Sequence, residues 1–263
     1  MTIKLLKYEL RSSAMLMAIV WAAMILTSIM VTFFTESLVH ADSAFIQVLA
    51  SIPVFLFGAA CVAMAVGMTF IIVIRFYKSL MGDEGYLMHT LPVKEWELIT
   101  SKGMSATLYT IGCAIVVLIS LAIFTKGAAV VELAKGFPYF LEHPVYILYV
   151  VQALVILIFG IVKSVYQVYA SLAIGQLVDK HRILLATGAY CGISTAIGML
   201  ASIFAVIGIN INLNIDLFDP LTNLPNFAMM EVLLFVLFLI EFAQVAVFHV
   251  ITERLLTKKL NLL

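Results

Sequence analysis

Long apolar runs, separated by shorter polar segments, make up most of the chain. A transmembrane helix needs about 20 predominantly apolar residues, and each of these runs approaches or exceeds that length. The pattern therefore predicts an all-α, polytopic membrane protein with a single transmembrane domain over residues 1–263. We expect six transmembrane helices, at about residues 14–34, 45–74, 103–124, 145–162 (or as far as 178), 183–209 and 227–251.

The composition agrees with this interpretation. Hydrophobic residues make up 64% of the 263 residues and charged residues only 11%, and the mean hydropathy is +1.15. A soluble domain is about half apolar and about a quarter charged, so the lipid bilayer is the expected environment. The formal net charge is zero, which gives no reason to expect a nucleic-acid partner.

The basic residues predict the orientation of the helices, because they are enriched on the cytoplasmic side of membrane proteins. If the N-terminus is inside, the outer segments hold only Lys126 and Lys135. The inner segments then hold Lys4, Lys7, Arg11, Arg75, Lys78, Lys94, Lys102, Lys180, Arg182, Arg254, Lys258 and Lys259. We therefore predict cytoplasmic N- and C-termini and a multi-pass protein of the cell membrane.

Two segments outside the expected spans have helical patterns of their own. In residues 2–13, basic and apolar positions fall on different faces, which indicates either a helix in the inner membrane interface or simple positive-inside anchoring. Residues 128–141 fit either a short interfacial helix on the outer side or a plain loop.

The segment 75–102 (RFYKSLMGDEGYLMHTLPVKEWELITSK) is the longest polar interruption of the chain. It balances basic against acidic residues and contains a Gly-Asp-Glu-Gly turn, a proline and a tryptophan. Neighbouring helices can be joined by about 2–8 residues, so this length is far more than a connection needs. An aromatic, charge-balanced surface suits a protein partner; a loop packed on itself is the alternative.

The amino-acid sequence of this segment resembles the corresponding sequence in one group of membrane subunits of type-2 ABC exporters. This group is common in Gram-positive bacteria. The matching residues are Arg75-Phe76-Tyr77, Gly82-Asp83-Glu84-Gly85-Tyr86-Leu87 and Thr90-Leu91-Pro92-Val93. In topology the resemblance covers the whole chain, and in specific residues only about 75–102.

The resemblance implies a cytoplasmic coupling helix between spans two and three and an elbow helix at 2–13. The nucleotide-binding ATPase would be a separate chain that binds ATP and magnesium, and a second copy or a homologous membrane subunit would complete the transporter. Its cargo would be an amphipathic peptide, drug or lipid-like molecule. The residues expected to meet the ATPase are Gly82, Asp83, Glu84, Gly85, Tyr86, Thr90, Leu91, Pro92 and Trp96.

Motifs of enzymes are missing from the sequence. There is no Gly-x-x-x-x-Gly-Lys-Ser/Thr phosphate loop, no His-Glu-x-x-His zinc motif and no Gly-x-Ser-Gly serine-protease motif. We therefore predict no catalytic residue, no metal site and no cofactor in this chain. The three cysteines lie in apolar runs and are interpreted as small buried hydrophobic residues.

Polar residues inside the expected spans are the remaining candidates for function. Glu241 lies near the middle of the sixth span, and a carboxylate at that depth costs several kcal/mol unless it is paired or hydrated. Together with Gln244 it is expected either to line a cavity or to bond between helices. Lys163 could pair with Glu241, but counting residues from the start of its span favours a side chain that extends to the inner interface.

Gly188 and Gly192 form a small-x-x-x-small pair that favours close helix packing, either within one subunit or between two. Two other functions remain open. One is a secondary transporter that uses Glu241 as its ion or proton site. The other is a membrane scaffold or sensor that recruits a regulator through segment 75–102.

Overall fold

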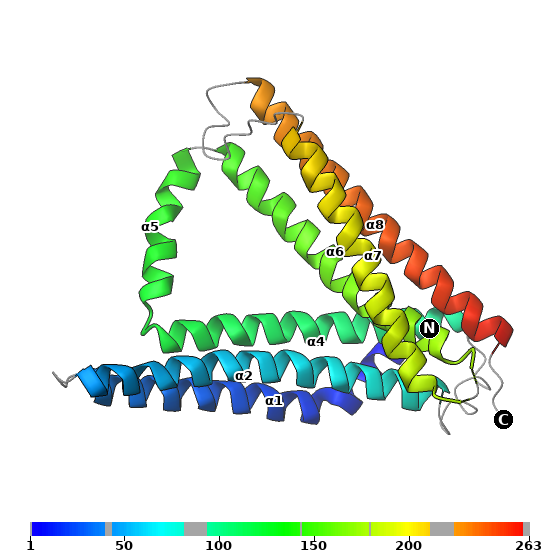
Figure 1. The fold of residues 1–263 in the computed structure, drawn as a ribbon, viewed down its shortest axis with the longest axis horizontal. Coiled ribbons are helices and arrows are strands. Elements are labelled where there is room, and N and C mark those ends of the chain that lie inside the picture. The colour runs from blue at the N-terminus through cyan, green and yellow to red at the C-terminus, as the bar shows by residue number, and fades with distance from the viewer. Residues whose placement is uncertain are drawn as a thin grey trace. The chain divides into compact units, whose positions relative to one another are not determined.

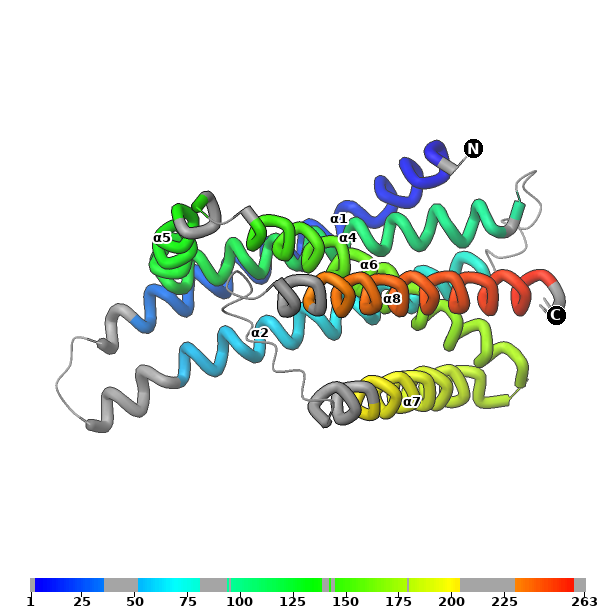
Figure 2. Tube along the Cα trace, turned by 90° about the horizontal axis from the view of Figure 1, so that it is seen from above, coloured from blue at the N-terminus to red at the C-terminus, as the bar shows by residue number. Residues whose placement is uncertain are grey.

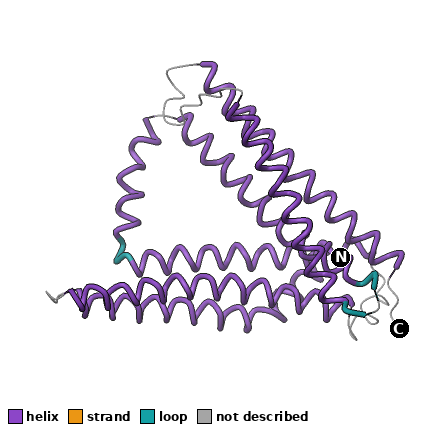
Figure 3. The backbone as a smooth tube through the Cα atoms, in the orientation of Figure 1, coloured by secondary structure: helices purple, strands orange, loops and turns teal. Residues whose placement is uncertain are grey.

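The computed structural model describes residues 2–39, 44–81, 94–142, 144–178, 180–210 and 224–259 (Figure 1). These residues are almost entirely helical, and no strand occurs among them (Figure 3). The elements are α1 (Thr2–Val39), α2 (Ala44–Phe76), the π-helical turn η1 (Tyr77–Met81), α4 (Glu95–Phe124), α5 (Ala128–Glu142), α6 (Pro144–Gly175), α7 (Arg182–Asn210) and α8 (Leu224–Lys259).

Six of these helices are long and apolar enough to cross a membrane, which confirms the number of spans expected from the sequence. Every expected span falls within one of them. The fourth follows the longer of the two expected alternatives, because α6 continues to Gly175. Most of the helices extend beyond the apolar runs, since a helix needs internal hydrogen bonds and no particular polarity to continue.

Three polar segments of the sequence are wholly or partly helical in the structure. Residues 2–13 are the first part of the continuous helix α1, so a separate elbow helix is not confirmed. Residues 128–142 form the helix α5 rather than a plain loop. Segment 75–102 is helical at both ends: α2 and η1 continue to Met81, and α4 begins at Glu95. The connection is therefore much shorter than the 28-residue loop expected.

The chain divides into two compact units. Unit 1 comprises Met1–Phe76 and Thr100–Leu148, and unit 2 comprises Tyr77–Ile99 and Tyr149–Leu263. The boundary runs through α4 and α6, each of which has a few residues in one unit and most in the other.

Unit 1 is held together by an apolar seam between α1, α2 and α4. The buried positions recur every three or four residues, and this is the period that keeps one face of a helix against its neighbours. α1 and α2 run alongside each other in both views (Figures 1 and 2). The core consists of Met17, Met24, Val31, Phe57, Met64, Met68, Tyr109, Cys113 and Val116.

Polar contacts join the three helices at one end of unit 1. Lys102 of α4 forms an ion pair with Glu9 of α1, and Tyr109 donates a hydrogen bond to the carbonyl oxygen of Leu10. Arg75 of α2 donates to the carbonyl oxygen of Ser12. The start of α1, the end of α2 and the start of α4 therefore lie together, as expected for helices that alternate in direction.

Unit 2 packs tightly where α6 meets α7. Gly175, the last residue of α6, lies so close to α7 that a Cβ atom built on it would come within 2.7 Å of both Ala186 Cβ and the carbonyl oxygen of Arg182. The preceding turns of α6 are fully buried, with Ala170 and Ala173 almost without exposed surface. The small residues at the end of α6 thus permit the close approach of α6 and α7.

Candidate functional site: a polar row in unit 2

α6 and α8 carry polar side chains at intervals that return to one helix face. On α6 these are Gln152, Lys163 and Gln167, separated by three turns and then one turn. Hydrogen bonds join α6 to α8 at residue separations of 79 and 78, so the two helices run parallel with a constant stagger. We define the polar row as Gln152, Lys163, Gln167, Ser194, Glu231, Glu241 and Gln244.

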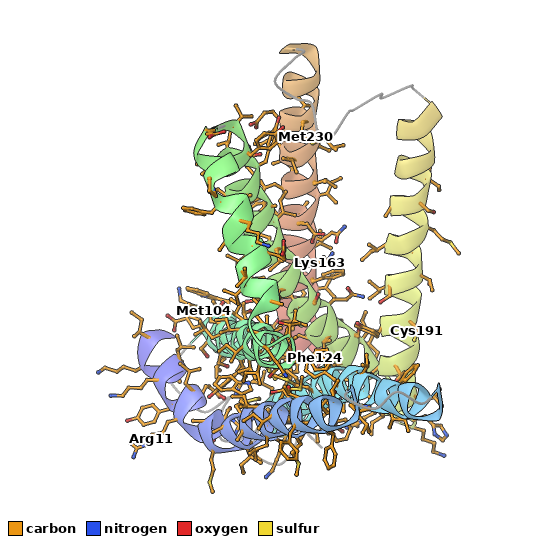
Figure 4. The ribbon with its side chains drawn as sticks, turned by 90° about the vertical axis from the view of Figure 1, so that its left-hand side faces the viewer. Arg11, Met104, Phe124, Lys163, Cys191 and Met230 are labelled. Atoms are coloured by element: carbon orange, nitrogen blue, oxygen red, sulfur yellow. The ribbon has the colours of Figure 1, made fainter. Side chains whose placement is uncertain are left out.

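An ion pair lies in the middle of the polar row. Lys163 Nζ of α6 is 2.8 Å from Glu241 Oε1 of α8, and the two side chains are 19% and 21% exposed. Figure 4 shows Lys163 on α6 with its side chain directed towards α8. Of the two interpretations of Lys163, the structure thus shows the pair with Glu241. Pairing offsets much of the cost of placing either charge inside a bilayer.

A second contact lies near the start of α8. Gln152 Nε2 of α6 donates a hydrogen bond of 2.6 Å to Glu231 Oε2. The other oxygens of the two groups, Gln152 Oε1 and Glu231 Oε1, are buried and have no hydrogen-bond partner among the described residues. Glu231 thus meets a neutral amide, whereas Glu241 meets a cation.

α7 contributes to the polar row through one contact. Gln167 Nε2 of α6 lies 2.7 Å from Ser194 Oγ, and Gln167 is buried. At the adjacent residue of α6, the rings of Tyr166 and His249 of α8 lie in a T-shaped arrangement at a centroid distance of 5.3 Å. Phe159 packs against Phe238 and Phe242 of α8 between the polar contacts. Polar and aromatic contacts thus alternate along α6.

The polar row contains several buried oxygen atoms that accept no hydrogen bond from the described residues. Besides the two oxygens near Glu231, Glu241 Oε2 and Gln244 Oε1 are buried without a partner in the described part of the chain. Buried polar atoms are nearly always hydrogen-bonded, so such oxygens indicate a missing donor. The row can therefore accept N–H or O–H donors, including water, and it presents no nucleophile or metal-binding cluster: among the described residues, no group of three His, Cys, Asp or Glu could hold a metal ion.

The predicted ATPase-contacting residues fall almost entirely outside the described residues: Gly82, Asp83, Glu84, Gly85, Tyr86, Thr90, Leu91 and Pro92. Trp96 is described. It lies in the first turn of α4 with 42% of its surface exposed, close to the buried Leu98 and Ile99.

Gly188 and Gly192 lie together on α7, but neither packs closely against another helix of the described chain. A Cβ atom built on either would meet nothing within 4 Å. The glycines of close approach are Gly175 and Gly112, where a Cβ atom on Gly112 would lie 2.5 Å from the Trp21 ring. Packing of Gly188 and Gly192 against a second subunit stays a prediction.

Three residues of the polar row were not singled out from the sequence: Gln152, Gln167 and Ser194. The available signal was a glutamine within an otherwise apolar run, at a helical interval from Lys163. Glu231 lies close to the outer end of the expected span 227–251, and from this position alone a hydrated side chain is expected. The structure adds that its carboxylate meets Gln152.

Comparisons of the chain with family models, curated proteins and solved structures find no match. The class that the described residues define is a helical membrane protein with six helices long and apolar enough to be spans.

Proposed function

We propose that this chain is the membrane subunit of an ATP-driven exporter of the type-2 ABC class. It would dimerise with a second membrane subunit, and separate ATPase subunits would bind ATP and magnesium. The observation that carries the proposal is the sequence of segment 75–102, which contains the motifs Gly82-Asp83-Glu84-Gly85-Tyr86 and Thr90-Leu91-Pro92-Val93. Six apolar helices long enough to cross a membrane support it.

The helices that flank this segment suit mechanical coupling. α2 and η1 continue to Met81 and α4 begins at Glu95, so long helices lead into the connection from both sides. The connection 82–93 itself lies outside the described residues. A stiff helix moves as one body, and closure of two ATPase subunits against such a connection would tilt α2 and α4 and open a path through the membrane.

The test replaces the two acidic residues of the predicted Gly-Asp-Glu-Gly turn. Asp83→Ala with Glu84→Ala is expected to reduce co-purification of the ATPase subunit and to lower stimulated ATP hydrolysis by about tenfold, since an interface loses on the order of 1.4 kcal/mol or more with two charges. The measurement uses the tagged chain and ATPase subunits expressed in the same cells, recovered together by affinity purification. Glu132→Ala with Lys135→Ala, which removes an exposed ion pair from α5, is the matched control. Unchanged binding and hydrolysis in the acidic-turn variant would remove the coupling role.

A second candidate function is ion-coupled secondary transport. The observation that favours it is the Lys163–Glu241 pair, because charged residues within spans commonly mark ion or proton paths. Transport into vesicles driven by a pH gradient in the absence of nucleotide would support this candidate and exclude the exporter proposal. Glu241→Gln should abolish that transport and leave ATPase binding unchanged.

A further inference from the structure

The charges on α6 and α8 do not balance within the membrane. Between residues 145 and 175 and between 231 and 249, the only Asp, Glu, Lys or Arg residues are Lys163, Glu231 and Glu241. Lys163 is paired with Glu241 at 2.8 Å. Glu231 has only the neutral amide of Gln152 as its hydrogen-bond partner among the described residues. Within these two ranges, one carboxylate therefore has no basic residue to balance it.

Two acceptor oxygens lie unfilled at the same place. Glu231 Oε1 and Gln152 Oε1 are both buried, and neither has a hydrogen-bond partner in the described part of the chain. An ionised carboxylate away from water is costly unless a positive charge and further hydrogen bonds compensate it. The missing ligand should therefore bring a positive charge and at least two N–H or O–H donors.

The position of Glu231 narrows the class of ligand. It lies in the second turn of α8, near the first residue of the expected span 227–251, where the polar group of an amphiphile lies. The neighbouring side chains Val151, Val232 and Phe235 are apolar and exposed, and could contact an alkyl chain. Two oxygens are too few for Ca²⁺ or Mg²⁺, which take about six or more oxygen ligands.

We propose that Glu231 and Gln152 form a binding site for the primary ammonium group of an amphiphile. The ammonium carries one positive charge and three N–H donors, enough for both unfilled oxygens. The idea that such an amphiphile is the cargo rests on the proposed exporter function. The binding site itself is a property of this chain alone.

The experiment measures binding to the full chain in phosphatidylcholine nanodiscs, without nucleotide or ATPase. Dodecylamine is the probe, and dodecyltrimethylammonium, which has the charge but no N–H donor, and dodecyl sulfate are the comparisons. Saturable thermal stabilisation by dodecylamine is expected, with at least about tenfold weaker apparent affinity for the quaternary compound, because hydrogen bonds to charged groups contribute on that scale. Equal stabilisation by the two cations would overturn the proposal, and so would stabilisation by dodecyl sulfate.

Substitutions of single residues test whether Glu231 forms the ammonium-binding site. Glu231→Gln keeps the size of the side chain and should lower the apparent affinity for dodecylamine at least about tenfold. Glu253→Gln, which removes a carboxylate from the far end of the same helix, should leave it unchanged. Binding that survives Glu231→Gln, or that sodium chloride reproduces when it replaces choline chloride at equal ionic strength, would overturn the site. If Glu231→Gln does not fold, the comparison of primary and quaternary amines on the unmodified chain still decides.

Two sources of the ammonium group can be distinguished in the same assay. Nanodiscs that contain phosphatidylethanolamine should weaken dodecylamine binding if lipid headgroups occupy the site, and leave it unchanged if a free amphiphile is the ligand. Either result supports recognition of a primary ammonium. Absence of binding would remove this inference and leave the exporter proposal standing, because that proposal depends on Asp83 and Glu84 rather than on Glu231.

Discussion

The two units of the chain use different means to hold their helices together. In unit 1, α1, α2 and α4 bury methionines and other apolar side chains along a regular seam, and polar contacts gather at one end. In unit 2, polar pairs lie within the spans themselves. The most apolar windows of α1, α2 and α4 are 22%, 22% and 28% buried, against 0%, 6% and 6% for α6, α7 and α8.

This difference indicates where specificity resides in each unit. Lipid tails are as apolar as leucine, so apolar contacts hold helices in a bilayer through close packing rather than through exclusion of water. Unit 1 has such packing. Unit 2 has little of it in the most apolar windows of its helices, and its close packing lies towards the end of α6. The polar row should therefore determine how α6 and α8 align. Substitutions should therefore act by different mechanisms in the two units.

Breaking the central ion pair should have the largest effect. Lys163→Met leaves the Glu241 carboxylate without a cation and should destabilise unit 2 by about 4 kcal/mol. Replacing both residues, Lys163→Met with Glu241→Met, should recover most of that loss, because no charge is left behind. The unfolding free energy in a denaturing-detergent titration measures both, and hydrogen exchange assigns the change to α6 and α8.

The corresponding pair of unit 1 is the matched control. Glu9 has nearly the same exposed fraction as Glu241, but Glu9 and Lys102 lie outside the expected spans 14–34 and 103–124. Water can therefore solvate Glu9 in Lys102→Met, and the expected loss is only about 1 kcal/mol. Equal losses in the two variants would contradict the placement of Lys163–Glu241 deeper in the membrane.

Truncation of the apolar seam should come next. Met24→Ala removes a side chain that is 3% exposed and leaves a cavity between the helices of unit 1. The expected cost is about 3 kcal/mol. Met30→Ala, on the same helix but 62% exposed, should change stability by less than about 0.5 kcal/mol. A thermal unfolding series on both variants checks the difference, and similar melting temperatures would show that the seam contributes little.

The helix positions of both units could be predicted from the sequence, because a run of about 20 apolar residues leaves the backbone no stable alternative to a helix in lipid. The orientation of each helix about its axis could not. The sequence indicates that Glu241 needs a partner and offers Lys163 as one possibility. Only the structure shows that the two side chains form an ion pair. Counted from the expected span starts, 145 and 227, Lys163 lies four residues deeper than Glu241. Counted from the observed helix starts, Pro144 and Leu224, the difference is only two residues, so the two side chains can meet.

Glycine spacing illustrates the same limit. The pair Gly188 and Gly192 marks a face of α7 that could approach another helix, but spacing does not say whether a helix is there. Close approach occurs instead at Gly112 and Gly175, neither of which has a second glycine four residues away. Contacts of this kind depend on how helices cross, which a single sequence does not encode locally.

Adding one methyl group tests this distinction. Gly175→Ala places a Cβ atom against the backbone of α7, so the helices must separate, and we expect a loss of about 2 kcal/mol. Gly188→Ala fills open space on α7 and should be neutral or stabilising by up to about 1 kcal/mol, since alanine favours helix more than glycine does. Detergent-induced unfolding of the two variants side by side measures this. A loss for Gly188→Ala would place a helix of a second copy against it.

The smallest effect should come from the contact between α6 and α7. Ser194→Ala leaves the buried Gln167 amide without its partner, whereas Gln167→Leu removes the amide altogether and leaves Ser194 free to bond a carbonyl oxygen of its own helix. We therefore expect a loss of about 1 kcal/mol for Ser194→Ala and almost none for Gln167→Leu. Hydrogen exchange of α7 should report the difference. The opposite order would mean that Gln167 contributes mainly through packing, and that the polar row aligns α6 with α8 but not with α7.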